Sequence, residues 1–290
     1  MMEVAPKRCK HKSPQLPTAN LLMCHDGIPT GLCNSNNSCG YNAVIAIVYN
    51  LWMESWEMWS GAFDDLNTDY LGALSANFCQ HEGSINGLEE CCKILQQHLQ
   101  WDSPHEIKRS AEINIHTLLQ CILTTPSITH SNVVWCDAGH SSHHGGSSCR
   151  NCLFFVLNDH RCLQDFINSS FENSLSSMCH ICNAHQIQKS TLICLPPLLA
   201  FDLSSCHGID IDHHLELTAN NMSAAYSLQG IIYYGHHHFT CRFVSQHGMV
   251  WYHCSIQTGT SLTNKGPLQL LGDLLRKGAL KVTAVLYPKL

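Results

Sequence analysis

The order of helical and strand-like patterns along the chain predicts an α+β fold. Apolar residues recur at helical spacing before Val133, whereas short strand-like runs separated by turn residues fill most of the sequence after it. The chain has 290 residues, of which 44% are hydrophobic, so it can bury a sizeable core. These observations indicate a helical part followed by a twisted antiparallel sheet.

The helical part follows a lead-in over residues 1–25 that we expect to be flexible, because it contains prolines and several lysines. A helix is expected over residues 37–52. This segment is apolar on nearly all sides, which predicts a central, buried helix. Residues 88–99 carry leucine and cysteine at helical spacing, and residues 116–123 make a further short helix.

The sheet is expected to begin near Val133. A loop over residues 141–148 separates its first two strands, and the run Gln246-His247-Gly248 predicts a tight hairpin between its last two. Such a sheet is expected to face the central helix. The expected strands cover residues 133–136, 153–157, 198–203, 227–233, 238–244 and 249–253.

Composition limits the classes of partner and compartment. Charged residues make up only 13% of the chain and the net charge is −6, which argues against a nucleic-acid surface and suits a partner with a basic face. No apolar run reaches the length of a membrane span, and the N-terminus lacks the apolar segment of a signal peptide. Eighteen cysteines in such a chain indicate thiols and metal ligands rather than disulfides, in the cytosol or nucleus.

Cys39 and His238 have the positions of a thiol nucleophile and its base. Cys39 stands at the start of the expected central helix, after small polar residues that favour a turn and a helix cap. A helix N-terminus favours the thiolate over the thiol. His238 lies on an expected strand across the cleft, where it can take the thiol proton and return it to a leaving amine.

The segment around Cys39 resembles the cysteine box of the ubiquitin-specific protease family. That box reads roughly Gly-Leu-x-Asn-x-Gly-Asn-Thr-Cys-aromatic-x-Asn. This chain matches it at Gly31, Leu32, Asn34, Asn37, Cys39 and Asn42, with Ser38 in place of Thr.

The segment around His238 resembles the histidine box of the same family. The run Tyr226-Ser227-Leu228-Gln229-Gly230-Ile231-Ile232 is similar to Tyr-x-Leu-x-Gly-Val-Ile. His238-Phe239-Thr240 and Trp251-Tyr252 are similar to the His-Tyr-Thr and Trp-Tyr that follow. Residues 195–203 and 284–287 are similar to two further strands. The matches keep the family's order from Gly31 to Tyr287 and so cover nearly the whole chain.

Departures from the pattern mark a divergent relative. Asn36 replaces a Gly of the cysteine box, and Gly40 replaces its aromatic residue. His236 and His237 replace the paired Gly before the catalytic His, and the thumb-helix signature is not recognisable over residues 84–90. Ser255 stands where the family usually has Asp or Asn, and no Asp or Glu occurs between Glu216 and Asp273.

The resemblance implies a papain-like cysteine protease fold. A lead-in would precede one catalytic domain over residues 26–290, which has a helical thumb (about 26–130), zinc-ribbon fingers (about 131–195) and an antiparallel palm (about 196–290). It implies hydrolysis of the isopeptide bond after the C-terminal Gly of ubiquitin or a ubiquitin-like modifier, which would be the partner.

The resemblance also assigns four catalytic roles. Cys39 would be the nucleophile and His238 the base, Ser255 would orient His238, and Asn34 would supply an oxyanion-hole donor. A hydroxyl stabilises an imidazolium less than a carboxylate does, so activity lower than in Asp-bearing relatives is expected. Asn37 is open to two interpretations, a helix cap or a further role in the site.

Two Cys-x-x-Cys pairs predict a structural zinc ion. Cys149 with Cys152, and Cys179 with Cys182, offer four thiolates for the tetrahedral geometry that Zn²⁺ prefers. The family has a zinc ribbon in this part of its chain. The alternative is that Cys136 and His140 replace the first pair. Neither pair follows a strand and opens a helix, so a thioredoxin-like redox role is not favoured.

Two other functions remain as alternatives. The first is a catalytically weak or inactive scaffold of the same fold that binds ubiquitin or a ubiquitin-like protein, as Ser255 and the missing Gly pair suggest. The second is a zinc-containing module that associates with nucleic acid through its Cys/His-rich centre, against which the net negative charge argues.

Overall fold

The computed structural model describes residues 29–35, 38–81, 85–102, 114–127, 130–142, 153–157, 161–169, 171, 173–206 and 208–290. The predicted lead-in over residues 1–25 lies outside these ranges, as do Asn36, Asn37, Cys149 and Cys152. Among the described residues, no helix is both long and apolar enough to cross a membrane.

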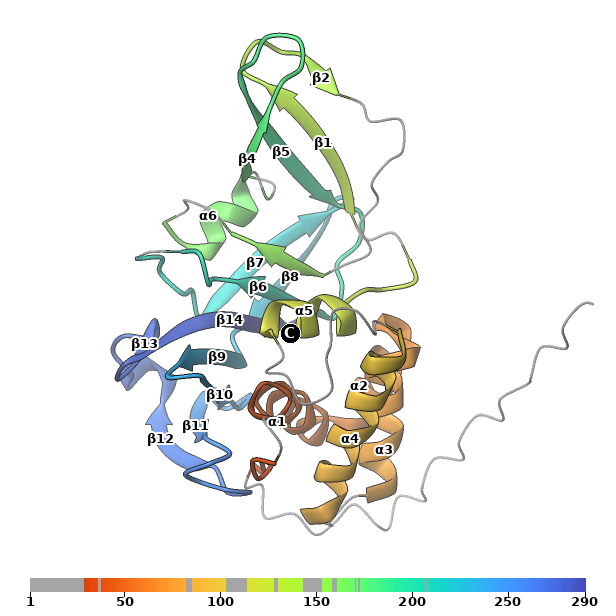
Figure 1. Ribbon diagram of the computed structural model, residues 1–290, viewed down its shortest axis with the longest axis vertical. Helices are drawn as coiled ribbons and strands as arrows, with labels where there is room; N and C mark the ends of the chain where they lie inside the picture. The colour runs from red at the N-terminus through yellow and green to blue at the C-terminus, as the bar shows by residue number, and fades with distance from the viewer. Residues whose placement is uncertain are drawn as a thin grey trace, which may run out of the picture.

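The helix α1 is seen end-on at the centre of Figure 1, between the other helices and the strands of the palm. Every residue of α1 from Cys39 to Trp52 is buried, as its all-round apolar sequence predicts. α1 contacts α2, α3, α4 and α5 on one side and the sheet on the other. The helices are α1 (Cys39–Glu54), α2 (Trp56–Leu66), the π-helix η1 (Thr68–Gly72), α3 (Ala73–His81), α4 (Ile85–Asp102), α5 (Ile115–Ile122) and α6 (Leu163–Asn168).

A large sheet forms the palm, with strand order β12-β11-β10-β9-β14-β6-β3 and β13 paired to β14. Its pairings are antiparallel except that of β3 with β6, which is parallel. The strands are β3 (Phe154–Val156), β6 (Leu198–Asp202), β9 (Gly230–Gly235), β10 (His238–Val244), β11 (Met249–His253), β12 (Thr263–Pro267), β13 (Arg276–Lys277) and β14 (Leu280–Pro288); the 3-10 helix η2 spans Leu268–Leu270.

The fingers project away from the palm at the top of Figure 1. They consist of a sheet of order β2-β1-β5-β4, and a separate hairpin of β7 and β8 lies between the fingers and the palm. The strands are β1 (His130–Cys136), β2 (Ser141–Ser142), β4 (Asn173–Met178), β5 (His185–Leu192), β7 (His214–Ala219) and β8 (Met222–Ser227).

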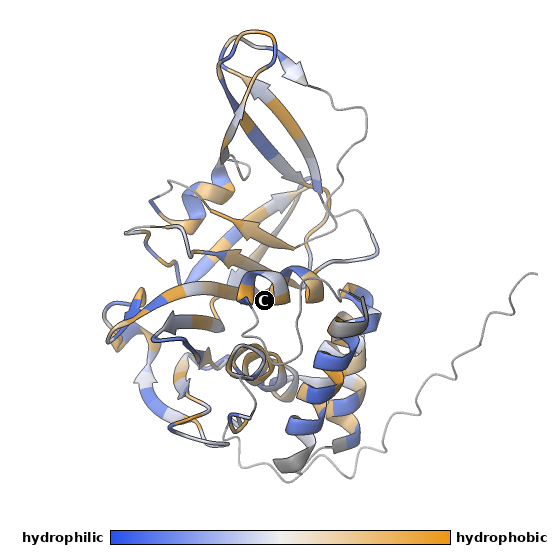
Figure 2. Ribbon diagram, in the orientation of Figure 1, coloured by the Kyte–Doolittle hydropathy of each residue, from blue (hydrophilic) through white to orange (hydrophobic). Residues whose placement is uncertain are grey.

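The core lies where α1 packs on β10 and β9. Gly230 allows the close approach of helix and sheet, because a Cβ atom there would lie 2.8 Å from Ile47 Cγ2. Figure 2 shows hydrophobic residues along α1 and the palm strands, and more hydrophilic residues along α4 and the finger strands. Burial of the apolar faces of α1 and the sheet therefore fixes the N-terminus of α1 relative to β10.

The expected α+β architecture of thumb, fingers and palm is confirmed, with differences in detail. β3 falls within the residues expected for the fingers, yet it pairs with β6 in the palm sheet. The strand expected over residues 227–233 is divided between the end of β8 and β9. The predicted hairpin between β10 and β11 is present, with Gly248 at a φ of +75°.

Candidate functional site

Cys39 is the first residue of α1, and its side chain is only 5% exposed. This places the thiol at the positive end of the helix dipole. The predicted side-chain cap of this helix is not formed by the residue at the cap position. Ser38 occupies the cap position, but its hydroxyl accepts hydrogen bonds from Ser35 N (3.1 Å) and Asn42 Nδ2 (3.0 Å) rather than from a helix amide. The Ser38 side chain therefore organises the loop before Cys39.

The loop before Cys39 is fixed to both the helix and the palm. Asn42 Nδ2 donates to Cys33 O (2.9 Å), and Gly31 N donates to Thr260 O (2.8 Å). Asn34 N donates to Ser255 O at 3.0 Å, while the Asn34 side chain is exposed. These bonds connect the segment that carries the nucleophile to the turn after β11.

His253 lies against the same loop. Its Nε2 is 3.2 Å from Leu32 N and 3.0 Å from the carbonyl oxygens of Leu32 and Gly259. A side chain at Gly31 would collide with this ring, which explains the glycine there. Burial lowers the pKa of His253, so the neutral ring is the form that the fold accommodates.

His238 is the first residue of β10 and is half-buried. Its Nε2 lies 3.3 Å from Cys254 Sγ, and burial lowers its pKa. Ser255 is only 5% exposed, and its Oγ has no hydrogen-bond partner among the described residues. The hydrogen bond expected between Ser255 and His238 is therefore not formed, and a thiol occupies that place.

The turn before His238 has a left-handed backbone. His236 and His237 have φ values of 53° and 57°, a conformation that glycine adopts most readily. The family that the sequence resembles has its paired Gly here. Two exposed histidines thus hold a turn that is sterically unfavourable for them.

A cleft lies between α5 and the palm, with a volume of about 450 Å³. His116 Nδ1 on α5 lies 2.7 Å from Asp202 Oδ2 on β6, so an ion pair or hydrogen bond bridges thumb and palm. Tyr234 and Phe239 line the cleft, and Phe239 directly follows His238. No sequence signal identified His116 and Asp202, because only the fold brings these distant residues together.

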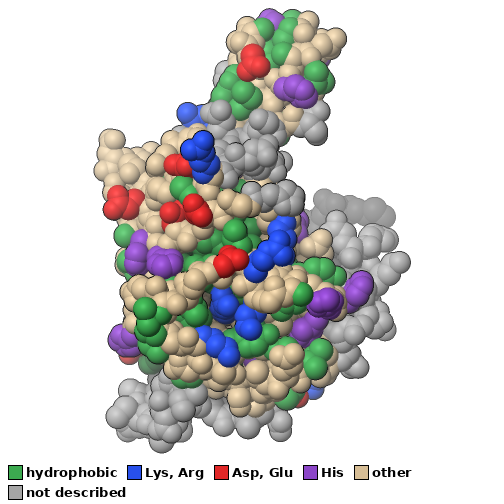
Figure 3. Space-filling view, turned by 90° about the vertical axis from the view of Figure 1, so that its left-hand side faces the viewer, with side chains coloured by type: hydrophobic (Ala, Val, Ile, Leu, Met, Phe, Trp, Pro, Cys, Tyr) green, Lys and Arg blue, Asp and Glu red, His purple; other side chains and the backbone are tan. Residues whose placement is uncertain are grey.

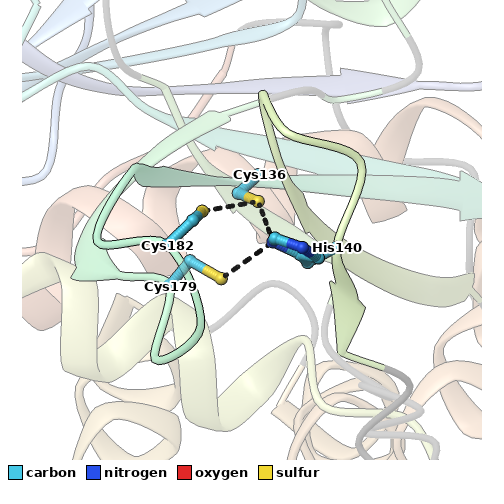
Figure 4. A group of neighbouring side chains, drawn as sticks. All are labelled: Cys136, His140, Cys179 and Cys182. Atoms are coloured by element: carbon cyan, nitrogen blue, oxygen red, sulfur yellow. Dashed lines mark hydrogen bonds between the residues drawn. The ribbon is translucent and has the colours of Figure 1, made fainter.

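A second candidate site, for a metal ion, lies in the fingers (Figure 4). The side chains of Cys136, His140, Cys179 and Cys182 offer three sulfurs and one nitrogen, all within 4.8 Å of one another. Cys136 and His140 come from the end of β1 and the following turn, and the two other cysteines come from the turn between β4 and β5. The four residues point toward a common centre in Figure 4.

The spacing of these donors fits a tetrahedral metal. Cys136 Sγ is 3.4 Å from Cys182 Sγ and 3.5 Å from His140 Nδ1, and Cys179 Sγ is 3.9 Å from His140 Nδ1. Tetrahedral Zn²⁺ with ordinary bond lengths separates its ligands by about 3.3–3.8 Å. Backbone amides of Ile181 and Cys182 lower the pKa of the Cys179 thiol to about 6. Among the described residues, the Cys136–His140 pair lies beside Cys179 and Cys182, as the alternative ligand set predicts, whereas Cys149 and Cys152 fall outside the described ranges.

The sequence matches no family model and no curated protein. Solved structures do resemble the fold. A chain of the SAGA DUB module of Ubp8, Sgf11, Sus1 and Sgf73 bound to monoubiquitin matches with a TM-score of 0.53 and 13% identity, covering 91% of this chain and 70% of that one. The module bound to ubiquitin aldehyde matches with a TM-score of 0.55 and 13% identity, covering 91% of this chain and 70% of that one. A yeast module with an Sgf73 mutant matches with a TM-score of 0.50 and 14% identity, covering 91% of this chain and 69% of that one. At these identities the likeness shows a shared deubiquitinase-like fold.

Proposed function

We propose that the protein is a thiol isopeptidase that cleaves ubiquitin, or a ubiquitin-like protein, from lysine side chains. The observation that carries the proposal is the packing of α1 on β10, which joins the helix that starts at Cys39 to the strand that starts at His238. The two adjoining elements thus begin with a thiol at a helix N-terminus and with a half-buried histidine, the two kinds of group that nucleophilic catalysis by a thiol needs. The likeness to a DUB module bound to ubiquitin supports ubiquitin as the first modifier to test.

In the proposed reaction, Cys39 attacks the carbonyl carbon of the modifier's C-terminal Gly, and its proton passes to His238. The proton then leaves with the lysine amine, and water hydrolyses the thioester. The Asn34 side chain and backbone amides at the start of α1 would stabilise the oxyanion. The cleft beside Phe239 is the proposed path for the modifier's tail.

A ubiquitin probe with a C-terminal electrophile tests this function. Wild-type protein should form a covalent adduct, and Cys39→Ser should lose it. Cys33→Ser is the matched control, because Cys33 is exposed and lies in the same loop. An adduct that persists in Cys39→Ser, or that disappears in Cys33→Ser, contradicts the assignment of the nucleophile.

The second candidate function is a modifier-binding scaffold without activity. The contact between His238 and a thiol, in place of a carboxylate, is the observation that favours it. A scaffold would bind ubiquitin non-covalently and leave the probe unreacted. A nucleic-acid module would ignore ubiquitin altogether, so the same probe separates the three functions.

We further propose that Cys136, His140, Cys179 and Cys182 hold one structural Zn²⁺. Elemental analysis should find about one zinc per chain. The Cys136→Ser variant should lose this zinc and should melt at a lower temperature. Cys149→Ser should keep the metal. Cys194→Ser is the matched control, since this thiol lies beyond β5 and outside the cluster. Retention of zinc by Cys136→Ser with loss in Cys149→Ser would restore the pair first predicted from the sequence.

A further inference from the structure

Two neighbouring side chains follow β11, and only one of them contacts the histidine. Cys254 Sγ lies 3.3 Å from His238 Nε2, within the range of a hydrogen bond to sulfur, whereas Ser255 Oγ is buried and has no hydrogen-bond partner among the residues that the structure describes. We propose that the Cys254 thiol orients His238, so that the third member of the catalytic set is a sulfur atom. This role rests on the thiol-isopeptidase function proposed above.

The register of β10 and β11 explains which side chain reaches the ring. Cys241 pairs with His253, so continuation of this register sets Cys254 opposite Thr240. Side chains alternate between faces, which places Cys254 on the face of Thr240 and His238 and one step away diagonally from His238. Ser255 falls on the opposite face.

The backbone of Cys254 is held in place by Thr258. Cys254 N donates to Thr258 Oγ1 (3.1 Å), and Cys254 O accepts from Thr258 N (2.8 Å) and from Thr258 Oγ1 (3.0 Å). Cys254 is also only 2% exposed. A buried thiol on a fixed backbone has little freedom to leave the histidine, as a positioning residue requires.

The contact holds the tautomer that a general base needs in the arrangement where the ring nitrogen is the donor. When Nε2–H donates to Cys254 Sγ, the lone pair of Nδ1 remains available for the proton of the Cys39 thiol. That proton moves to Nδ1 and later to the leaving amine, while the hydrogen on Nε2 stays with the sulfur. Sulfur is a weaker acceptor than a carboxylate, so the imidazolium is stabilised less than in a set completed by Asp.

Among the described residues that border the cavity beside His238, none carries a carboxylate. A cavity of about 310 Å³ is bordered by His238, Cys254, Thr240, Tyr252 and Lys277, and its lining, which also includes His236 and Gln257, holds no carboxylate among the described residues. Lys277 Nζ lies 5.0 Å from the centre of the Tyr252 ring.

Figure 3 shows lysine and arginine side chains gathered on this face of the molecule. His253, the remaining ionisable neighbour, packs against the loop before Cys39, and burial lowers its pKa. With no carboxylate in that lining, Cys254 Sγ is the acceptor at hand for His238, and burial disfavours the imidazolium.

Turnover of a ubiquitin C-terminal substrate is the first test. Cys254→Ala should lower kcat about tenfold with little change in KM, because orientation of the base is lost while substrate binding is kept. Cys254→Asp should restore or raise kcat and move the basic limb of the pH profile upward, since a carboxylate stabilises the imidazolium. Cys241→Ala is the matched control, a buried thiol on the other face of β10. Equal losses in Cys241→Ala and Cys254→Ala, or a pH profile that only Ser255→Asp moves, overturn the proposal.

A second test does not depend on ubiquitin. The pH of half-maximal alkylation of Cys39 by iodoacetamide reports how well the imidazolium is stabilised. It should fall by about one unit in Cys254→Asp and stay unchanged in Ser255→Asp. If wild type ignores ubiquitin but this shift appears, the substrate assignment is wrong and the positioning role stands. An unchanged value in Cys254→Asp, with the melting temperature retained, refutes the role of Cys254.

Discussion

The two sides of the proposed catalytic cleft differ in how well their polar groups are satisfied. On the cysteine side, Asn42 and Ser38 form a connected set of hydrogen bonds around the loop that leads into α1. On the histidine side, Arg242 Nε and Ser255 Oγ are buried and have no hydrogen-bond partner within the described part of the chain, and two histidines occupy a left-handed turn. Local conflicts of this kind concentrate at functional sites, where geometry is retained at a cost in stability.

This comparison explains where the resemblance in sequence holds and where it fails. The cysteine side keeps Asn42, which donates a hydrogen bond to the loop, and Gly31, where any side chain would collide with the ring of His253. The histidine side has lost the Gly pair and the carboxylate but keeps the strand pairing of β9, β10 and β11. A frame built from backbone hydrogen bonds tolerates such substitutions, because the ladder does not depend on side-chain identity.

The largest effect is expected for Asn42→Ala. This substitution removes the donor to Cys33 O and one of the two donors to the buried Ser38 Oγ, which should lower the free energy of unfolding by about 2–4 kcal/mol. Chemical denaturation measures this change. Asn77→Ala is the control, because Asn77 Nδ2 bonds Ala73 O within its own helix. Equal costs for the two substitutions would show that the loop is not held through Asn42.

An intermediate effect is expected from pH, through His253. Burial lowers the pKa of His253 below its ordinary value of 6.5, so the folded state binds its proton less readily than the unfolded chain. This contribution to stability is fully present above pH 6.5 and is lost as pH falls through the lowered pKa. His253→Gln should flatten the loss of melting temperature between pH 7 and pH 5, whereas His247→Gln, at an exposed turn position, is the control. An unchanged slope in His253→Gln contradicts the account.

The smallest effect is expected in the turn before His238. His236→Gly combined with His237→Gly should raise the free energy of unfolding by about 1 kcal/mol, because glycine removes the left-handed strain. The gain is partly offset by the greater freedom of glycine in the unfolded chain. His247→Gly should instead lower stability, since His247 does not have a positive φ. Thermal unfolding that ranks the two changes in the opposite order would show that the histidine turn is unstrained.

Much of this arrangement could be predicted from the sequence, because apolar patterns are local. The helix near residues 37–52 and the hairpin of β10 and β11 follow from such patterns, whereas the closing strand β14 was expected from the resemblance of residues 284–287 to the last strand of the family. The finger strands β4 and β5 were not expected, because they are polar and only partly buried and so lack a clear alternation.

The parts of the site that could not be predicted depend on register and on long-range packing. The sequence comparison pointed to Ser255, whereas strand alternation after Tyr252 brings Cys254 to the ring of His238. One residue of register decides which side chain faces the site. The sequence likewise offered Cys136 with His140 as only one of two ways to complete the metal ligands, because a spacing in sequence does not fix distance in space.

The pH dependence of Cys39 alkylation tests most directly whether the two sides of the cleft form one catalytic pair. If His238 stabilises the thiolate, Cys39 of the wild type should react at a pH well below the ordinary thiol pKa of about 8.5. His238→Ala should raise the half-maximal pH by at least about one unit, while Cys33, exposed in the same loop, keeps its profile as an internal control. Identical Cys39 profiles in wild type and His238→Ala would contradict the account, because the thiol and the histidine would then titrate independently.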